Sequence, residues 1–162
     1  MTIRISATRE MPDARVFVAF DQPHRRGAIE PLDPRHESPL GRLRLSGRIT
    51  EREYNAGCQW RTIYFSWLHS IGAPNPHPAA IDYGVVSDRQ EPMGTADDDE
   101  RDAAIAKAFR GGEAVLKRLG PRAFHAVGAV AVYEETEELG DFQFTARAAQ
   151  KGLAALAEHF GC

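Results

Sequence analysis

The sequence predicts an all-α protein in which a helical hairpin is followed by a C-terminal part of three helices. Apolar residues recur at spacings of three and four along 50–71, 97–119 and 141–160, which is the period of an amphipathic helix. Helix-start signals stand at the head of the hairpin, and Gly120-Pro121 separates two of the later helices. These observations together predict a fold built from helices.

We expect four segments along the chain. Residues 1–37 lack sustained periodicity and form a flexible arm, within which the apolar run Val16 to Phe20 suits an edge strand or a docking peptide. The hairpin covers 38–71, a proline-rich connection covers 72–96, and the C-terminal helical part covers 97–162.

The hairpin is the first clearly helical element. Ser38 suits an N-cap and Pro39 the first helical position, and this short helix stops at Gly47. A second helix starts at Thr50, where Glu53 completes a capping box, and runs to about Ile71. Its expected inner stripe is Tyr54, Gly57, Arg61, Tyr64 and Leu68, widened by Trp60, Ile63 and Trp67, although both tryptophans also suit an interface.

The C-terminal part is expected to hold three helices. The first starts near Asp97, and Gly111-Gly112 inside it indicates either close packing of a partner helix or a kink. Residues 121–133 are apolar nearly all round, which fits a buried helix, although the Val-Ala-Val ending also suits a strand. The last helix has an apolar stripe from Phe142 to Phe160 that could pack within the monomer or form the seam of a homodimer.

Charge is distributed unevenly over the 162 residues, whose net charge is −3. Residues 1–72 carry 11 Arg and 8 acids, whereas residues 73–162 carry 9 Lys or Arg and 15 acids. A nearly neutral total can therefore contain basic faces. No apolar run reaches the roughly 20 residues that span a bilayer, so we expect a cytoplasmic protein without a membrane partner, with Cys58 and Cys162 reduced.

Enzyme chemistry is not indicated by any motif. The six histidines show no HxH or HxxxH spacing for a metal, and Gly111-Gly112 lacks the Lys and Ser of a phosphate loop. His125 on an apolar helix reads as a core histidine. We therefore expect no catalytic residues, no metal site and no cofactor.

Several segments resemble a known group. "SPLGRL" and "GRITEREYNAG" at 38–57, "AAIDYG" at 79–84 and "RAAQKGLAALAEHFG" at 147–161 are similar to short alphaproteobacterial and prophage proteins of unassigned function. The end of those proteins resembles the helix-turn-helix of sigma-factor DNA-binding regions. The resemblance implies a prophage-related regulator of transcription. The stretch Glu134 to Gly140 is shorter here, so part of that unit is remodelled or lost.

Two surfaces are candidates for contact with double-stranded DNA. On the last helix, Gln143, Arg147, Gln150 and Lys151 share one face, where Gln and Arg suit base edges and Lys suits phosphate; a solvated face is the alternative. The second surface lies on the hairpin, where four arginines suit contacts with phosphates: Arg42, Arg44, Arg48 and Arg52. The alternative is that they form local ion pairs with neighbouring acids.

The acidic run Glu134 to Glu138 would repel phosphates, and it suits a solvated loop, a partner for the hairpin arginines, or a mimic of nucleic acid. A module that binds a host or phage protein, for example in transcription, is therefore the alternative function.

Overall fold

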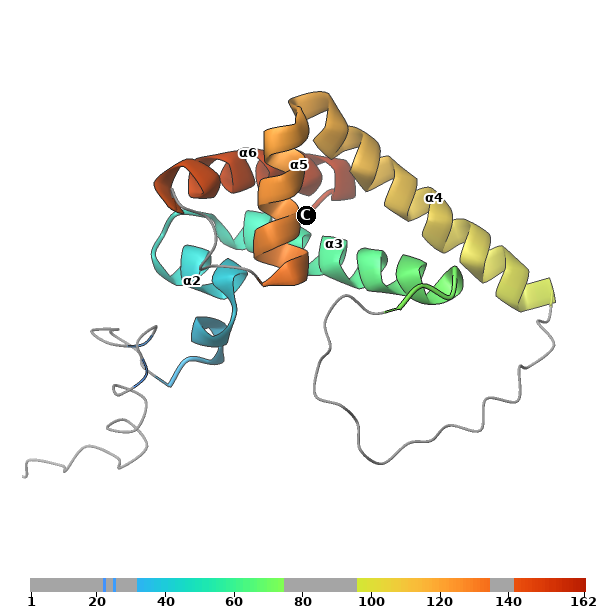
Figure 1. Ribbon diagram of the computed structural model, residues 1–162, viewed down its shortest axis with the longest axis horizontal. Helices are drawn as coiled ribbons and strands as arrows, with labels where there is room; N and C mark the ends of the chain where they lie inside the picture. The colour runs from blue at the N-terminus through green and yellow to red at the C-terminus, as the bar shows by residue number, and fades with distance from the viewer. Residues whose placement is uncertain (1–21, 23–24, 26–31, 75–95, 135–141) are drawn as a thin grey trace, which may run out of the picture. The chain divides into compact units, whose positions relative to one another are not determined.

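The computed structural model describes residues 22, 25, 32–74, 96–134 and 142–162 (Figure 1). For residues 96, 97 and 142–144 it describes the backbone only. The chain divides into two compact units, Met1–Glu37 and Ser38–Cys162. The apolar run Val16 to Phe20 and the segment "AAIDYG" at 79–84 lie outside the described residues.

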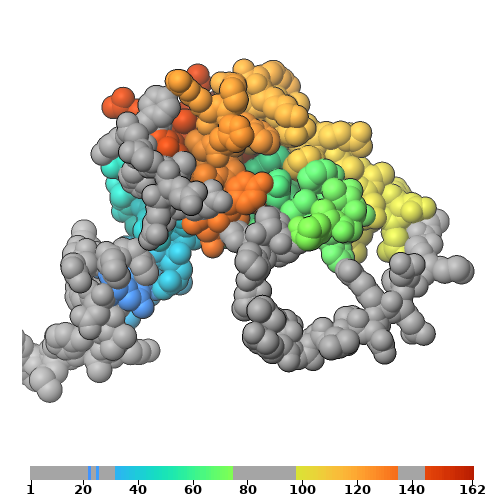
Figure 2. Space-filling view, in the orientation of Figure 1, coloured from blue at the N-terminus to red at the C-terminus, as the bar shows by residue number. Residues whose placement is uncertain are grey.

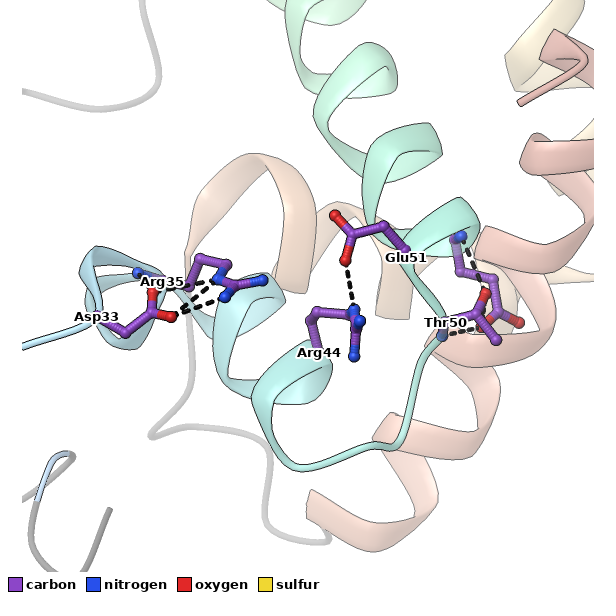
Figure 3. Close-up of polar contacts among 6 residues, drawn as sticks. Asp33, Arg35, Arg44, Thr50 and Glu51 are labelled. Atoms are coloured by element: carbon purple, nitrogen blue, oxygen red, sulfur yellow. Dashed lines mark hydrogen bonds and ion pairs between the residues drawn. The ribbon is translucent and has the colours of Figure 1, made fainter. Parts of the chain in front are cut away.

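The described part of the first unit is held by two local ion pairs. Arg25 pairs with Glu37, the last residue of the short 3₁₀ helix η1 (Pro34–Glu37). The guanidinium of Arg35 donates to both carboxylate oxygens of Asp33, and its backbone N–H donates to Oδ1 at 2.8 Å (Figure 3). These hydrogen bonds lower the pKa of Asp33 to about 2.

The second unit consists of helices throughout its described residues, which contain no strand, so the expected all-α class is confirmed. The helices are α2 (Pro39–Leu45), α3 (Glu51–Ser70), α4 (Ala96–Leu119), α5 (Pro121–Val127), the π-helical turn η2 (Gly128–Tyr133) and α6 (Phe142–Phe160).

Both predicted helix starts of the hairpin are present. The Ser38 hydroxyl accepts a hydrogen bond from the Gly41 N–H at 3.0 Å, and Pro39 takes the first position of α2. At the start of α3, the Thr50 hydroxyl accepts from the Glu53 N–H at 3.2 Å, while the Glu53 carboxylate accepts from the Thr50 N–H at 2.6 Å (Figure 3). The capping box satisfies backbone donors that a helix end otherwise leaves unpaired.

Helix α6 is the centre of the second unit and packs against α3, α5 and α4 (Figure 1). The specific arrangement expected, a hairpin beside a three-helix part, is not confirmed, because α3 packs mainly on α6 and α4 rather than on α2. The inner positions of α6 are almost fully buried, and they are Ala146, Ala149, Leu153, Leu156 and Ala157. The described inner positions of this stripe therefore pack within one chain, which is the first of the two alternatives for it.

Gly112 of α4 packs closely against another helix, so the double glycine in α4 does not mark a kink. A Cβ at Gly112 would lie 2.5 Å from the Trp60 ring, which is 1% exposed. The Trp60 ring stacks on Phe109 with centroids 5.5 Å apart. Helix α4 runs without interruption through both glycines, so the first of the two alternatives, a closely packed partner helix, is the one found.

The apolar stretch 121–133 is helical, as the sequence favoured, and its ending is not a strand. It is buried on one side only, and His125, which the sequence suggested as a core histidine, lies on the exposed side. Gly120 has φ +100° and allows the turn from α4 into α5, whose first residue is Pro121. The second half, η2, adopts a π-helical hydrogen-bond pattern and buries Val130, Ala131 and Val132. Within the described part of the chain, no helix is long and apolar enough to cross a membrane.

Candidate nucleic-acid interface

An open depression of about 310 Å³ joins the two surfaces that the sequence indicated separately. Its lining consists of Arg48, from the turn between α2 and α3, together with Ala146, Arg147 and Gln150 of α6. Two guanidinium groups and one amide therefore border the same hollow. Guanidinium groups suit the geometry of phosphate oxygens, and an amide suits a base edge.

The packing of α6 fixes which of its side chains reach this surface. Because Ala146, Ala149 and Leu153 face the core, the residues between them, Arg147, Gln150 and Lys151, are turned outward and are exposed. No hydrogen bond or ion pair joins these three side chains to another described residue. We name the set formed by Arg48, Arg147, Gln150 and Lys151 the α6 face.

Arg52 lies at the edge of the α6 face. It occupies the first turn of α3, and its guanidinium donates to the Ala157 carbonyl oxygen of α6 at 3.4 Å. This contact draws the charge of Arg52 toward the C-terminal half of α6. Both Arg48 and Arg52 are therefore hairpin arginines that meet α6.

The other two of the four candidate arginines on the hairpin, Arg44 and Arg42, each interact with an acid. Arg44 Nε donates to Glu51 Oε2 at 2.7 Å, the local ion pair that the sequence left open as an alternative (Figure 3). Arg42 is partly buried; burial lowers the pKa of its guanidinium, and the charge of Glu134 acts in the opposite direction. We therefore leave both out of the α6 face.

Glu134, the first residue of the acidic run, forms an ion pair with the hairpin. It ends η2 in a left-handed conformation, with φ +54°, and its carboxylate pairs with Arg61 of α3. Pairing with a hairpin arginine was one of the uses expected for this run. Residues 135–138 lie outside the described residues, as does the side chain of Gln143.

The described residues offer no metal centre and no disulfide. No group of three or more His, Cys, Asp or Glu within them is arranged to hold a metal ion. Cys58 and Cys162 are both free thiols, and Cys162 Sγ lies 3.4 Å from Gln59 Oε1.

The juxtaposition of Arg48 with Arg147 is the feature that the sequence did not predict. The two residues are far apart along the chain, and each belonged to a different candidate surface. Packing of α6 on α3 brings them to one hollow, and no local pattern reports such a contact.

Comparisons with protein-family models, with curated proteins and with solved structures found no match for this chain. The resemblance described for the C-terminal helix therefore remains an expectation from the sequence.

Proposed function

We propose that this chain is a cytoplasmic, prophage-related regulator of transcription that binds double-stranded DNA through the α6 face. The observation that supports the proposal is the depression in which Arg48, Arg147 and Gln150 meet. Arg147 and Lys151 contact phosphates, while Gln150 lies where it can meet a base edge. The alternative reading, a merely solvated helix face, does not account for an arginine from another element lining the same hollow.

The test is fluorescence anisotropy of a labelled duplex at about 50 and about 200 mM salt. Each phosphate contact adds about 0.9 to the slope of log affinity against log salt concentration. For Arg147→Ala with Lys151→Ala we expect binding about tenfold weaker or more at low salt, and a slope smaller by about 2.

The control removes the same charge from a distant part of the unit. Arg101 and Lys107 are both exposed on the N-terminal half of α4. Arg101→Ala with Lys107→Ala should leave affinity within about threefold of the unchanged chain. Equal losses in the two variants would contradict a local site, and no binding of the unchanged chain at low salt would contradict DNA binding altogether.

A protein partner is the second candidate function, and the C-terminal half of α3 favours it. Tyr64, Phe65 and Trp67 are each partly exposed there, and Ile71 is 55% exposed. Aromatic side chains in such positions are typical of protein interfaces. Unchanged DNA affinity in the α6-face variant, together with loss of a protein complex in Trp67→Ala, would favour this candidate over the first.

A further inference from the structure

The apolar contact between α3 and α4 is left open at one end. Trp67 of α3 stacks face to face on Phe109 of α4, with ring centroids 3.9 Å apart. Phe109 is buried, whereas Trp67 is only partly buried, and Ile71, one turn further along the chain, is 55% exposed. Ile105, one turn before Phe109, is also partly exposed. We name the set formed by Trp67, Ile71 and Ile105 the α3–α4 patch.

The patch is one continuous surface and not a scatter of single side chains. Trp67 and Ile71 are four residues apart and share a face of their helix, as do Ile105 and Phe109. The stacked rings join these two pairs. Figure 1 shows the C-terminal end of α3 and the N-terminal half of α4 on the same side of the unit, and Figure 2 shows both helices at the surface. A contiguous exposed apolar surface is typical of an interaction site, unlike a single exposed apolar residue.

Acidic residues flank the patch on α4. Residues 98–105 contain four acids and one cation, Arg101, for a net charge of −3, and residues 62–74 contain no Lys, Arg, Asp or Glu. Asp102 lies seven residues before Phe109, which places it on the face of α4 that turns toward α3. Asp99 lies one turn before Asp102. The C-terminal end of α3 contributes the negative end of its dipole, so the surroundings of the patch are negative.

Helix stability accounts for only part of this charge. Asp99 lies in the first turn of α4, where the positive end of the dipole favours an acid. Asp102 lies in the second turn, beyond the reach of that effect. Both carboxylates are exposed, and neither makes a hydrogen bond or an ion pair with another described residue. They are therefore available to a cationic partner.

The architecture favours a helix as the partner. The described part of the chain contains no strand, and the backbone groups of α3 and α4 are paired within their own helices, so the patch offers no edge to an extended peptide. Apolar side chains on two adjacent helices suit the apolar face of a third helix, with anchors at i, i+3, i+4 and i+7. Helix α6 of a second copy cannot serve, because its apolar stripe is buried within its own unit.

We propose that the α3–α4 patch binds an amphipathic helix of a partner protein, with Lys or Arg beside its apolar face. The apolar face of that helix covers Trp67, Ile71 and Ile105, and its cations pair with Asp99 and Asp102. This inference rests on the second candidate function, to which it gives a partner chemistry, and it is independent of DNA binding by the α6 face.

The experiment measures the fluorescence anisotropy of three labelled helical peptides against the full chain. All three carry Leu at the anchor positions and differ only beside the apolar face, where they carry Lys, Gln or Glu. We expect affinity to fall in that order, with the Lys peptide binding about tenfold or more tightly than the Glu peptide at about 50 mM salt.

Variants of the chain locate the site. Ile71→Ser should weaken binding of the Lys peptide about fivefold or more, and circular dichroism should show an unchanged fold because Ile71 is exposed. Asp102→Asn should weaken it about threefold. Glu100→Gln is the matched control: it removes one charge from the opposite face of the same helix and should change affinity by less than about 1.5-fold.

The outcomes separate this inference from the proposed functions. If Ile71→Ser weakens the Lys and Glu peptides alike, the patch binds a helix but the partner is not basic, and only this inference fails. If no peptide binds the unchanged chain, the second candidate function fails with it. Ile71→Ser should bind the labelled duplex within about threefold of the unchanged chain, so failure of DNA binding leaves the inference intact.

Other occupants of the patch would also overturn the inference. If the Lys peptide bound only after residues 75–95 were replaced by a Gly-Ser linker of equal length, the chain's own connection would be the occupant. If sedimentation showed a dimer that Ile71→Ser abolished and the Lys peptide did not disrupt, the occupant would be a second copy.

Discussion

At the residue scale, two adjacent glycines of α4 face different neighbours. A Cβ at Gly112 would lie 2.5 Å from the buried Trp60 ring, which is held by stacking on Phe109. A Cβ at Gly111 would approach only the imidazole of His159, an exposed side chain that can move away. The sequence showed the pair but could not show which member lies against a fixed ring.

The pair therefore gives a matched test of packing. Gly112→Ala should destabilise the fold by about 1–3 kcal/mol, because overpacking outweighs the better helix propensity of alanine. Gly111→Ala should be neutral or stabilising by up to about 1 kcal/mol, since the propensity gain is retained. Urea unfolding followed by circular dichroism measures both. Equal effects of the two substitutions would contradict the packing described for Trp60.

Tyr64 provides a second test at the residue scale. Burial raises the pKa of its hydroxyl to about 12, and the hydrogen bond to the Tyr133 hydroxyl at 2.8 Å adds to the shift. A phenol whose pKa is higher in the folded state stabilises the fold fully below the unfolded value of about 10, and this contribution is lost as pH rises from about 10 to about 12.

Tyr133→Phe should lower the pKa of Tyr64 while leaving it above its ordinary value, because burial remains the larger cause. Titration of the phenolate absorbance in the two proteins measures the difference. If the substitution left the titration of Tyr64 unchanged, the hydrogen bond would not contribute to the shift.

At the element scale, the sequence predicted helices wherever caps and period agreed. Ser38 and Thr50 cap their helices with their own side chains, and Pro121 follows Gly120 at the first position of α5, so the starts of α2, α3 and α5 could be predicted from the local sequence. The π-helical turn η2 could not be predicted from the sequence. A stretch that is apolar on all sides has no apolar stripe, and without a stripe the number of residues per turn cannot be inferred.

The turn at Gly120 allows a prediction about stability at the scale of the helices. Its φ of +100° and ψ of +166° lie in a region that residues with a Cβ rarely adopt. Gly120→Ala should therefore cost about 1–3 kcal/mol, although no atom crowds that position. Gly128→Ala is the control, since Gly128 has helical angles; equal melting temperatures for the two variants would show that Gly120 is not strained.

At the scale of the whole molecule, the sequence predicted the class of fold but not the candidate site. Arg48 and Arg147 were both recognised as candidates, yet only the packing of α6 on α3 brings them to one depression. Long-range packing, which no local pattern encodes, decides which residues meet at the candidate site.

The division of the chain gives a last prediction, on stability and binding together. Among the residues that the structure describes, the buried members of the hydrophobic core lie at Leu40 or beyond, and the proposed phosphate contacts begin at Arg48. A chain lacking residues 1–36 retains the Ser38 cap, so its unfolding free energy should change by less than roughly 1 kcal/mol, a shift of a few degrees in melting temperature. Its duplex affinity should also be retained. If the shortened chain kept its fold but lost its affinity for the duplex, the DNA contacts would instead belong to the six arginines of residues 1–37.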